Sequence, residues 1–385
     1  MKKIVSSILG LTLMANISTA LAENGVSEGE ILFGQSAAIN GPASALGTGM
    51  RDGIEAAFKE INDAGGVHGR KLKLITMDDG YEPDKAIENV NKLINGDKVF
   101  AHIGAVGTPT SKATAPIACE NNVPFVGPFT GAGFLREMDC VVNIRGSYCA
   151  EAETWVKHLT EDLGAKNISL LYQDDGFGRV GLDCVNQALD KRGMKLASSG
   201  KYKRNTVAVK GAVANIKKGN PDAIVTVGAY KPVEEFIKIA HQVKMNVPIL
   251  NVSFTGSNAL AQELGGKDAE KVVITQVVPF PFDASLPLVG EYQNALKSYD
   301  ASLNPGFVSL EGYLVGRITI ESLKKSGKDL NRNAFLNAFT GTHDLGGVEL
   351  TYNMPSDNQG KDDIYLTSVN NDGTFASLNS LKELK

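Results

Sequence analysis

Short β-branched runs alternate with longer amphipathic segments along most of this 385-residue chain. From Gly29 onward the runs have the length and composition of buried strands, and the segments between them place apolar residues at helical spacing. The expected strands are Ile31–Gln35, Lys71–Met77, Phe100–Ile103, Pro124–Val126, Val141–Ile144, Ile168–Tyr172, Ala223–Val227, Pro248–Val252 and Val272–Val277. This alternation predicts an α/β fold with parallel sheets flanked by helices.

The expected helices have recognisable ends, such as Ala64-Gly65-Gly66 after the first and Glu82-Pro83-Asp84 before the second. They are Met50–Ala64, Lys85–Ile94, Ser111–Glu120, Glu151–Leu163, Val180–Lys191, Val207–Lys218, Pro232–Val243, Leu286–Tyr299 and Ser309–Ser326. Near the end, Ile364–Val369 and Phe375–Leu378 flank Asn371-Asp372-Gly373, which predicts a β-hairpin.

The first residues have the order of a secretory signal. Met1-Lys2-Lys3 precedes an apolar stretch from Ile4 to about Ile17, and the small-residue site Ala20-Leu21-Ala22 follows. We therefore expect a signal peptide over residues 1–22, cut before Glu23, and a periplasmic mature protein. No Cys follows the cut directly, so a free protein is favoured over a lipid-tethered one.

Length and charge narrow the class of protein further. The mature chain is too long for one average domain and predicts two. Removal of Lys2 and Lys3 changes the formal charge from −4 to −6. Mild acidity without a basic stripe argues against a nucleic-acid partner.

Three loops between an expected strand and the following helix are rich in Gly, Pro, Ser and Thr: Ser36–Gly47, Gly104–Ser111 and Gly127–Gly133. In open parallel sheets, ligands bind outside the carboxyl ends of the strands, where such loops gather. Thr108 is expected as a helix N-cap, with Pro109 at the first helical position. A helix N-terminus suits a carboxylate ligand. The alternative is that Thr108 only caps its own helix.

Motifs for catalysis are absent from the sequence. The five His have no metal-ligand spacing, and Asp78-Asp79 is interpreted as a solvated strand end. The Gly47, Gly49 and Gly53 spacing does not fit a dinucleotide fingerprint, and Gly265-Gly266-Lys267-Asp268 does not fit a phosphate loop. No Gly-x-Ser-x-Gly elbow occurs. We expect no enzyme activity, no cofactor and no metal.

Several motifs, in order and spacing, resemble the branched-chain amino-acid-binding proteins, which are periplasmic receptors of ABC importers with the type I periplasmic-binding fold. They are Gly34-Gln35-Ser36, Gly41-Pro42-Ala43, Gly65–Leu72, Asp78-Asp79, Pro83, Gly104–Thr110, Gly127–Ala132, Asp174–Gly178, Val227–Pro232 and Glu311-Gly312-Tyr313. The resemblance covers essentially the whole mature chain.

This resemblance implies two Rossmann-like lobes joined by three crossovers. Lobe one would comprise residues 26–147 and 278–355, and lobe two residues 148–277 and 356–385. An amino acid or related small carboxylate would bind between the lobes, which close around it, and a monomer would deliver it to an ABC permease in the inner membrane. An exported sensor feeding a chemoreceptor or kinase is the alternative, and an enzyme on the same fold is a further one.

The resemblance also implies a set of ligand-binding residues. Gly107 and Thr108, with the loop Phe129-Thr130-Gly131, would hold the carboxylate end; the family's Thr falls on Gly131, and this chain has Thr130 one place earlier. For Phe129, an ordinary core role is the alternative. The side-chain pocket would be lined by Leu46, Phe177 and Tyr230. The family usually has Tyr at the first two positions, so a drier pocket is expected.

Phe254 departs most from the family pattern, because amino-acid-binding members carry there a Glu that pairs with the ligand's ammonium group. A buried ammonium without a carboxylate costs several kcal/mol. Either Glu311 or Asp175 replaces this Glu, or the ligand is not an ordinary α-amino acid. Tyr148, Glu311, Gln276 and Pro279 fall near the crossovers and could line the cleft. For Glu311 a structural hinge contact is the alternative.

Four cysteines lie in the mature part: Cys119, Cys140, Cys149 and Cys184. Three pairings are possible. We favour Cys119–Cys140 with Cys149–Cys184, because each pair then stays within one lobe. Buried thiols remain an alternative for the second pair.

Overall fold

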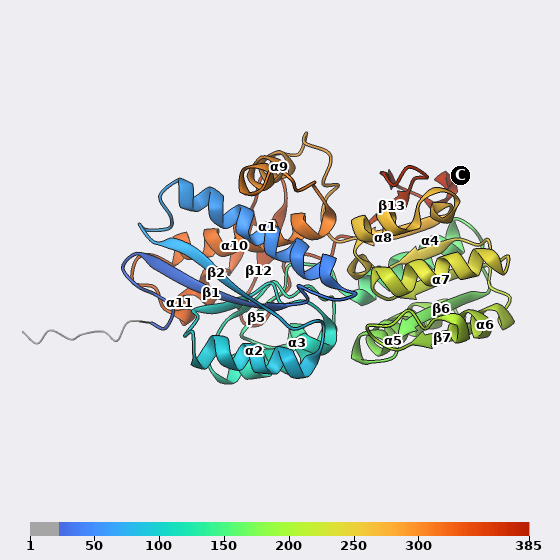
Figure 1. The fold of residues 1–385 in the computed structure, drawn as a ribbon, viewed down its shortest axis with the longest axis horizontal. Coiled ribbons are helices and arrows are strands. Elements are labelled where there is room, and N and C mark those ends of the chain that lie inside the picture. The colour runs from blue at the N-terminus through green and yellow to red at the C-terminus, as the bar shows by residue number, and fades with distance from the viewer. Residues whose placement is uncertain (1–22, 385) are drawn as a thin grey trace, which may run out of the picture.

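The computed structural model describes residues 23–384, and the expected signal peptide lies outside this range. The described chain forms two lobes that lie side by side (Figure 1). Each lobe is built on its own sheet with helices packed around it, which confirms the predicted α/β class.

Lobe one is built on a parallel five-stranded sheet of order β2-β1-β3-β4-β5. Its strands are β1 (Glu30–Ala37), β2 (Lys71–Asp78), β3 (Ala101–Ile103), β4 (Phe125–Val126) and β5 (Val141–Val142). The helices of this lobe are α1 (Ser44–Asp63), α2 (Pro83–Asn95), α3 (Thr108–Glu120), α9 (Pro287–Tyr299), α10 (Phe307–Ser326) and α11 (Arg332–Ala338) (Figure 1). A separate pair, β11 (Gly341–Asp344) and β12 (Glu349–Tyr352), is antiparallel.

Lobe two is built on a seven-stranded sheet of order β14-β13-β10-β9-β8-β6-β7. Its strands are β6 (Ile168–Gln173), β7 (Ser198–Tyr202), β8 (Ala223–Val227), β9 (Ile249–Asn251), β10 (Val272–Gln276), β13 (Tyr365–Val369) and β14 (Phe375–Leu378). The expected late hairpin is confirmed, because β13 and β14 pair antiparallel. The helices are α4 (Tyr148–Glu161), α5 (Gly176–Asp190), α6 (Lys210–Lys218), α7 (Tyr230–Gln242) and α8 (Ser257–Leu264) (Figure 1).

Several element boundaries differ from those expected. Helix α1 begins at Ser44, six residues before the expected Met50, so the loop after β1 is shorter than Ser36–Gly47. Strand β7 was not expected, because Ser198–Tyr202 contains no β-branched residue and forms the polar edge of the sheet. Helices α8 and α11 and the pair β11–β12 are further short elements without a strong apolar pattern.

The two disulfides of the favoured pairing are present in the structure. Cys119 and Cys140 have Cα atoms 5.5 Å apart and join the end of α3 to the segment before β5. Cys149 and Cys184, with Cα atoms 4.7 Å apart, join α4 to α5. Each bridge therefore links elements of a single lobe.

Candidate functional site

The strand order creates a comparable crevice in each lobe. In lobe one, β1 lies between β2 and β3, and in lobe two β6 lies between β7 and β8. Chain connections leave such neighbouring strands in opposite directions, and the space beyond their carboxyl ends is the usual ligand position in open α/β sheets. Leu46 and Thr108 follow β1 and β3, whereas Phe177 and Tyr230 follow β6 and β8.

Two threonine hydroxyls meet at the lobe-one crevice. Thr108 Oγ1 and Thr130 Oγ1 lie 2.7 Å apart in a hydrogen bond, and both residues are buried. The Gly107 N–H donates to the Phe129 carbonyl over 3.2 Å, so the two predicted loops are joined by backbone as well. The sequence suggested Thr108 as the N-cap of α3, but in the structure the N-cap is Gly107. Its φ of 103° is a conformation that favours glycine.

Gly131 and Tyr148 complete this group. A Cβ atom at position 131 would lie 2.7 Å from the Tyr148 backbone nitrogen, so a threonine does not fit there without a backbone shift. The Tyr148 phenol oxygen is buried near Thr108 and Thr130 without a well-aligned hydrogen bond. Burial raises the pKa of Tyr148, and Arg145 and the two threonines partly offset this rise. The phenol is therefore a neutral donor whose hydrogen-bonding capacity is unused.

An aromatic cluster lies where the two lobes meet, centred on Phe254. Its ring centroid is 4.7 Å from that of Phe177, 5.3 Å from that of Phe129 and 5.8 Å from that of Tyr81. Phe177 and Phe254 belong to lobe two, and Phe129 and Tyr81 to lobe one. All four rings are buried, so the structure is a closed arrangement in which side chains of both lobes touch.

Leu46 and Tyr230 extend this contact. Leu46 is fully buried, and a Cβ atom on Gly256 would lie 2.6 Å from its Cδ2 atom and 3.6 Å from Tyr230 Cδ1. Leu46 of lobe one therefore packs directly on the Gly256 backbone of lobe two. The sequence reasoning did not identify Tyr81 as a residue of this cluster. It lies in the turn that follows β2 and adopts a left-handed φ of 62° there.

A buried arginine links the lobes beside the aromatic cluster. Arg145 Nε lies 2.9 Å from Glu311 Oε1, and Nη2 donates to Ser253 Oγ over 2.8 Å. Its guanidinium also lies 4.4 Å from the centroid of the Phe129 ring, in a cation–π contact. Burial alone would lower the pKa of Arg145, but Glu311, Tyr148 and Glu151 outweigh it and raise that pKa. The sequence reasoning did not identify Arg145.

A second buried carboxylate, Glu151, continues this network. It accepts hydrogen bonds from the Ser253 backbone N–H over 2.7 Å and from Ser253 Oγ over 2.8 Å, and Thr275 Oγ1 also donates to it. Burial raises the pKa of Glu151, and it raises the pKa of Glu311 to about 7, although Arg145 opposes both rises.

The two acids considered as substitutes for the family's Glu are both engaged. Glu311 pairs with the buried Arg145. Asp175 accepts from the Phe177 backbone N–H over 3.0 Å, from Gln173 Nε2 over 2.7 Å and from Arg204 Nη1 over 2.9 Å. Neither carboxylate is free to receive a ligand ammonium group in this arrangement.

The interpretation of Asp78-Asp79 as a solvated strand end is wrong for its second residue. Asp79 is fully buried and accepts from Ser36 Oγ and from the Tyr81 backbone N–H, both over 2.8 Å. It thereby fixes the turn that presents Tyr81 to the cluster. Asp78 accepts from Ile39, Asn40 and Gly80 and holds the loop after β1.

Gln276 and Pro279 are not brought to the cluster around Thr108. Gln276 is buried and donates to Ser257 Oγ over 2.9 Å and to Thr367 Oγ1 over 2.8 Å, which are contacts within lobe two. With Pro279 it lines a separate cavity of about 440 Å³ beside β13 and β14.

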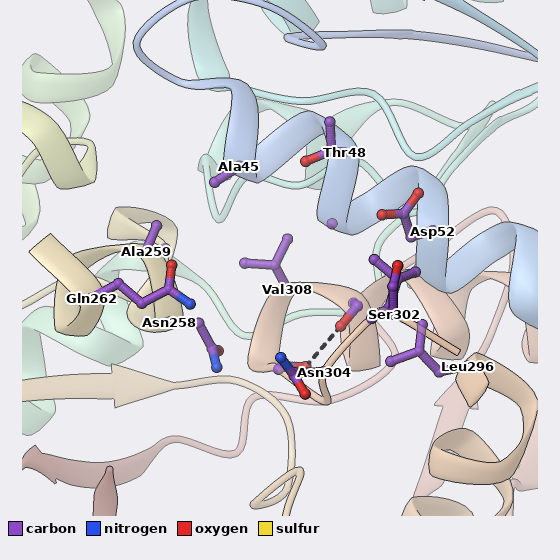
Figure 2. Close-up of a pocket in the computed structure, with 15 residues that line it drawn as sticks. Ala45, Thr48, Asp52, Asn258, Ala259, Gln262, Leu296, Ser302, Asn304 and Val308 are labelled. Atoms are coloured by element: carbon purple, nitrogen blue, oxygen red, sulfur yellow. Dashed lines mark hydrogen bonds between the residues drawn. The ribbon is translucent and has the colours of Figure 1, made fainter. Parts of the chain in front are cut away.

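A solvent-open groove of about 350 Å³ lies at the boundary between the lobes and is lined in part by Ala45 of lobe one and Asn258 of lobe two (Figure 2). It is lined from lobe one by α1, the start of α10 and the loop before it, and from lobe two by α8. The labelled polar residues include Thr48, Asp52, Asn258, Gln262 and Asn304 (Figure 2). Because Ala45 and Gly256 line it, this groove reaches the immediate neighbours of the buried cluster.

Two kinds of feature are not found in residues 23–384. No group of three or more His, Cys, Asp and Glu side chains in this range could hold a metal ion. No helix of the described chain is long and apolar enough to cross a membrane.

Two α/β lobes that meet at one buried interlobe cluster are the architecture of the type I periplasmic-binding class. The sequence matches the profile described as periplasmic binding protein over residues 30–374, and the chain belongs to this family. Within it, the chain belongs to the branched-chain amino-acid-binding group.

Solved structures support the assignment. A possible leucine/isoleucine/valine-binding protein from Rhodopirellula baltica is 36% identical, with a TM-score of 0.88 over 95% of this chain and 99% of that one. A substrate-binding periplasmic protein from Ralstonia solanacearum shares the fold at 23% identity, with a TM-score of 0.86 over 91% of this chain and 100% of that one.

Curated relatives are more distant. The Leu/Ile/Val-binding protein BraC3 of Rhizobium johnstonii is 27% identical over 185 residues, which are 48% of this chain and 50% of that protein. The chain thus spans about half the length of this relative and of a homologue from Brucella melitensis. The Leu/Ile/Val-binding protein of Escherichia coli K12 is 24% identical over 70% of this chain and 74% of its own length.

Proposed function

We propose that this protein is the periplasmic solute-binding component of an ABC importer, and that it binds an amino acid or related small carboxylate between its lobes. One observation supports this most. Side chains that follow the carboxyl ends of strands in both sheets meet at a single interlobe point, where Phe254 of lobe two contacts Phe129 and Tyr81 of lobe one. The relatives named as Leu/Ile/Val-binding proteins agree with such a role.

The lobe boundaries proposed from the sequence, 26–147 with 278–355 and 148–277 with 356–385, fit this role. Strands β1 to β5 precede residue 148, β6 to β10 fall between 148 and 277, and β13 and β14 follow 356. The chain would pass between the lobes three times, which suits a hinge about which the lobes open and close.

For the ligand, we propose that a carboxylate is held by Thr108, Thr130 and Tyr148, with the N-terminus of α3 behind them. Unused hydrogen-bonding capacity on the buried Tyr148 phenol supports this end of the site. The apolar part of the solute would lie against Leu46, Phe177, Tyr230 and Phe254. Because the closed rings touch one another, the lobes must open before a solute enters. Delivery to a permease, the absence of catalysis and a monomeric state belong to the same proposal.

A thermal-shift panel of amino acids, their amides and aromatic or aliphatic carboxylic acids tests this function. A ligand that binds only the folded state raises the melting temperature, by an amount that grows with the logarithm of its concentration divided by its dissociation constant. We expect at least one carboxylate to stabilise the protein. If only leucine, isoleucine and valine do so, Phe254 does not exclude an ordinary ammonium group. Chemical conversion of the bound solute would contradict the receptor proposal.

Thr108→Ala should weaken binding of the best solute from this panel by about 1–3 kcal/mol, because its hydroxyl would meet a charged group. Isothermal titration calorimetry provides the measurement. Thr160→Ala is the matched control, since its hydroxyl donates to the Val156 carbonyl within α4. Unchanged affinity in Thr108→Ala would remove this residue from the proposed site.

A further inference from the structure

We propose that Arg204 is a positioning residue that holds the two lobes closed and fixes two walls of the binding site, Tyr81 and Phe177. Arg204 lies in the loop between β7 and α6 of lobe two, outside every motif singled out in the sequence. This inference rests on the proposed receptor function, because it assigns a role within the same site.

Arg204 bonds to one carboxylate of each lobe. Its Nη2 atom donates to Glu82 Oε2 of lobe one over 2.7 Å, and its Nη1 atom donates to Asp175 Oδ2 of lobe two over 2.9 Å. The guanidinium carbon also lies 5.9 Å from the centroid of the Tyr81 ring. One planar cation therefore joins the residue before α2 to the N-cap of α5.

Neighbouring amides strengthen the same junction. Asn205 Nδ2 donates to Glu82 Oε1 over 2.7 Å and to the Gly80 carbonyl over 3.0 Å. Gln173 Nε2 donates to the Tyr81 phenol oxygen over 3.3 Å. We call Arg204, Asn205 and Gln173 with their lobe-one partners the interlobe clamp.

The clamp is divided unequally between the lobes. Asp175 shares lobe two with Arg204, so this ion pair persists when the lobes separate, whereas the contacts to Gly80, Tyr81 and Glu82 must break. Asp175 also accepts from the Phe177 N–H. Arg204 thus remains in place on lobe two, orients the start of α5 beside Phe177, and meets Glu82 and Tyr81 on closure.

Partial burial strengthens the Arg204–Asp175 pair, whereas the more exposed Arg204–Glu82 pair is partly screened by solvent. The Arg204 side chain is 21% exposed and that of Asp175 13%, while Glu82 is 44% exposed. Burial tends to raise the pKa of Glu82, but hydrogen bonds from Arg204 and Asn205 outweigh it and lower that pKa. The ionised clamp is therefore the favoured form.

An introduced thiol at Leu46 reports lobe opening without any ligand. Leu46 is fully buried against Gly256 of the other lobe, and all four native cysteines form disulfides. The rate at which Leu46→Cys reacts with an aromatic disulfide reagent then measures the open fraction, provided that closing is faster than labelling. Leu170→Cys, buried in strand β6, reports unfolding of lobe two instead.

In the full-length mature chain we expect Arg204→Gln to raise the Leu46→Cys labelling rate about fivefold, and to leave the Leu170→Cys rate unchanged. Glu82→Gln should act in the same direction, because it removes the lobe-one partner without touching Asp175. Lys201→Ala is the matched control, since Lys201 pairs with Asp174 inside lobe two over 2.9 Å. It should not change the labelling rate. High salt should accelerate labelling of the parent more than that of Arg204→Gln.

Two results would overturn the clamp. In one, the Leu46→Cys thiol reacts no faster in the Arg204→Gln protein than in the Lys201→Ala protein. In the other, the Leu46→Cys and Leu170→Cys rates rise together, which makes Arg204 a contributor to lobe stability and not to closure. Both results leave the receptor function intact, because its own test is the solute panel. Failure of the panel would likewise leave the labelling comparison valid.

Discussion

Asp79 illustrates how single buried polar residues shape this site. Its carboxylate is withdrawn from water and engaged by Ser36 and the Tyr81 backbone, and this holds Tyr81 against Phe254. Burial raises its pKa to about 6, against an ordinary value of 3.8, although those two hydrogen bonds oppose the rise. The folded protein therefore retains a proton on Asp79 at pH values where the unfolded chain has lost it.

The pH dependence of stability follows from this shift. Since the folded pKa lies above the unfolded one, the contribution of Asp79 to the unfolding free energy is greatest below about pH 4. It falls as the pH rises to about 6 and is constant above that. The fall amounts to about 3 kcal/mol at 1.36 kcal/mol for each pKa unit. Urea unfolding of the parent and of Asp79→Asn between pH 4 and 7 should show a difference that grows in favour of the variant. A difference independent of pH would contradict the assigned shift.

Among the elements, helices α1 and α10 pack unusually closely through glycines. A Cβ atom on Gly53 of α1 would lie 2.0 Å from the Ser309 carbonyl oxygen and 2.6 Å from the Tyr313 nitrogen. A Cβ atom on Gly312 of α10 would lie 2.3 Å from the Met50 carbonyl oxygen. The obstructing atoms belong to backbone, which cannot move aside as a side chain does. These glycines therefore set the position of α1, which carries Leu46.

Gly53→Ala should lower the unfolding free energy by about 3 kcal/mol, at the upper end of overpacking costs. Gly211→Ala in α6 is the matched control, because a Cβ atom there meets no atom within 4 Å. Alanine's greater helix propensity should make this control neutral or stabilising by up to about 1 kcal/mol. Chemical denaturation of both variants gives the comparison. Equal stability of the two variants would show that the α1–α10 interface can relax.

Elements with strong periodicity could be predicted from the sequence, and those without it could not. Ala223–Val227 was predicted residue for residue, because a β-branched run buried on both faces carries its own signal. Strand β7 and helices α8 and α11 are short and depend on tertiary packing. Thr108 was correctly expected beside a helix start. Gly107, however, supplies the cap, since Thr108 instead bonds to Thr130.

At the scale of the whole molecule, the site could be predicted where residues follow central strands, and not where they meet across the lobes. Thr108 and Thr130 in lobe one, and Phe177 and Phe254 in lobe two, come together because the parallel strands of each sheet align their carboxyl ends. Arg145 and Ser253 are 108 residues apart, and Arg204 and Glu82 are 122 apart, so no local pattern records their pairing. Closure of the two lobes is a property of these long-range contacts.

Native mass spectrometry of the protein purified gently from the periplasm, before any solute is added, tests the central claim most directly. The proposed function predicts one small carboxylate-bearing solute on each chain, with lower occupancy on Thr108→Ala prepared in parallel and unchanged occupancy on Thr160→Ala. Equal occupancy of the same solute on all three proteins would place it outside the interlobe site and contradict the account. An empty parent protein that also fails to bind any member of the solute panel would contradict it as well.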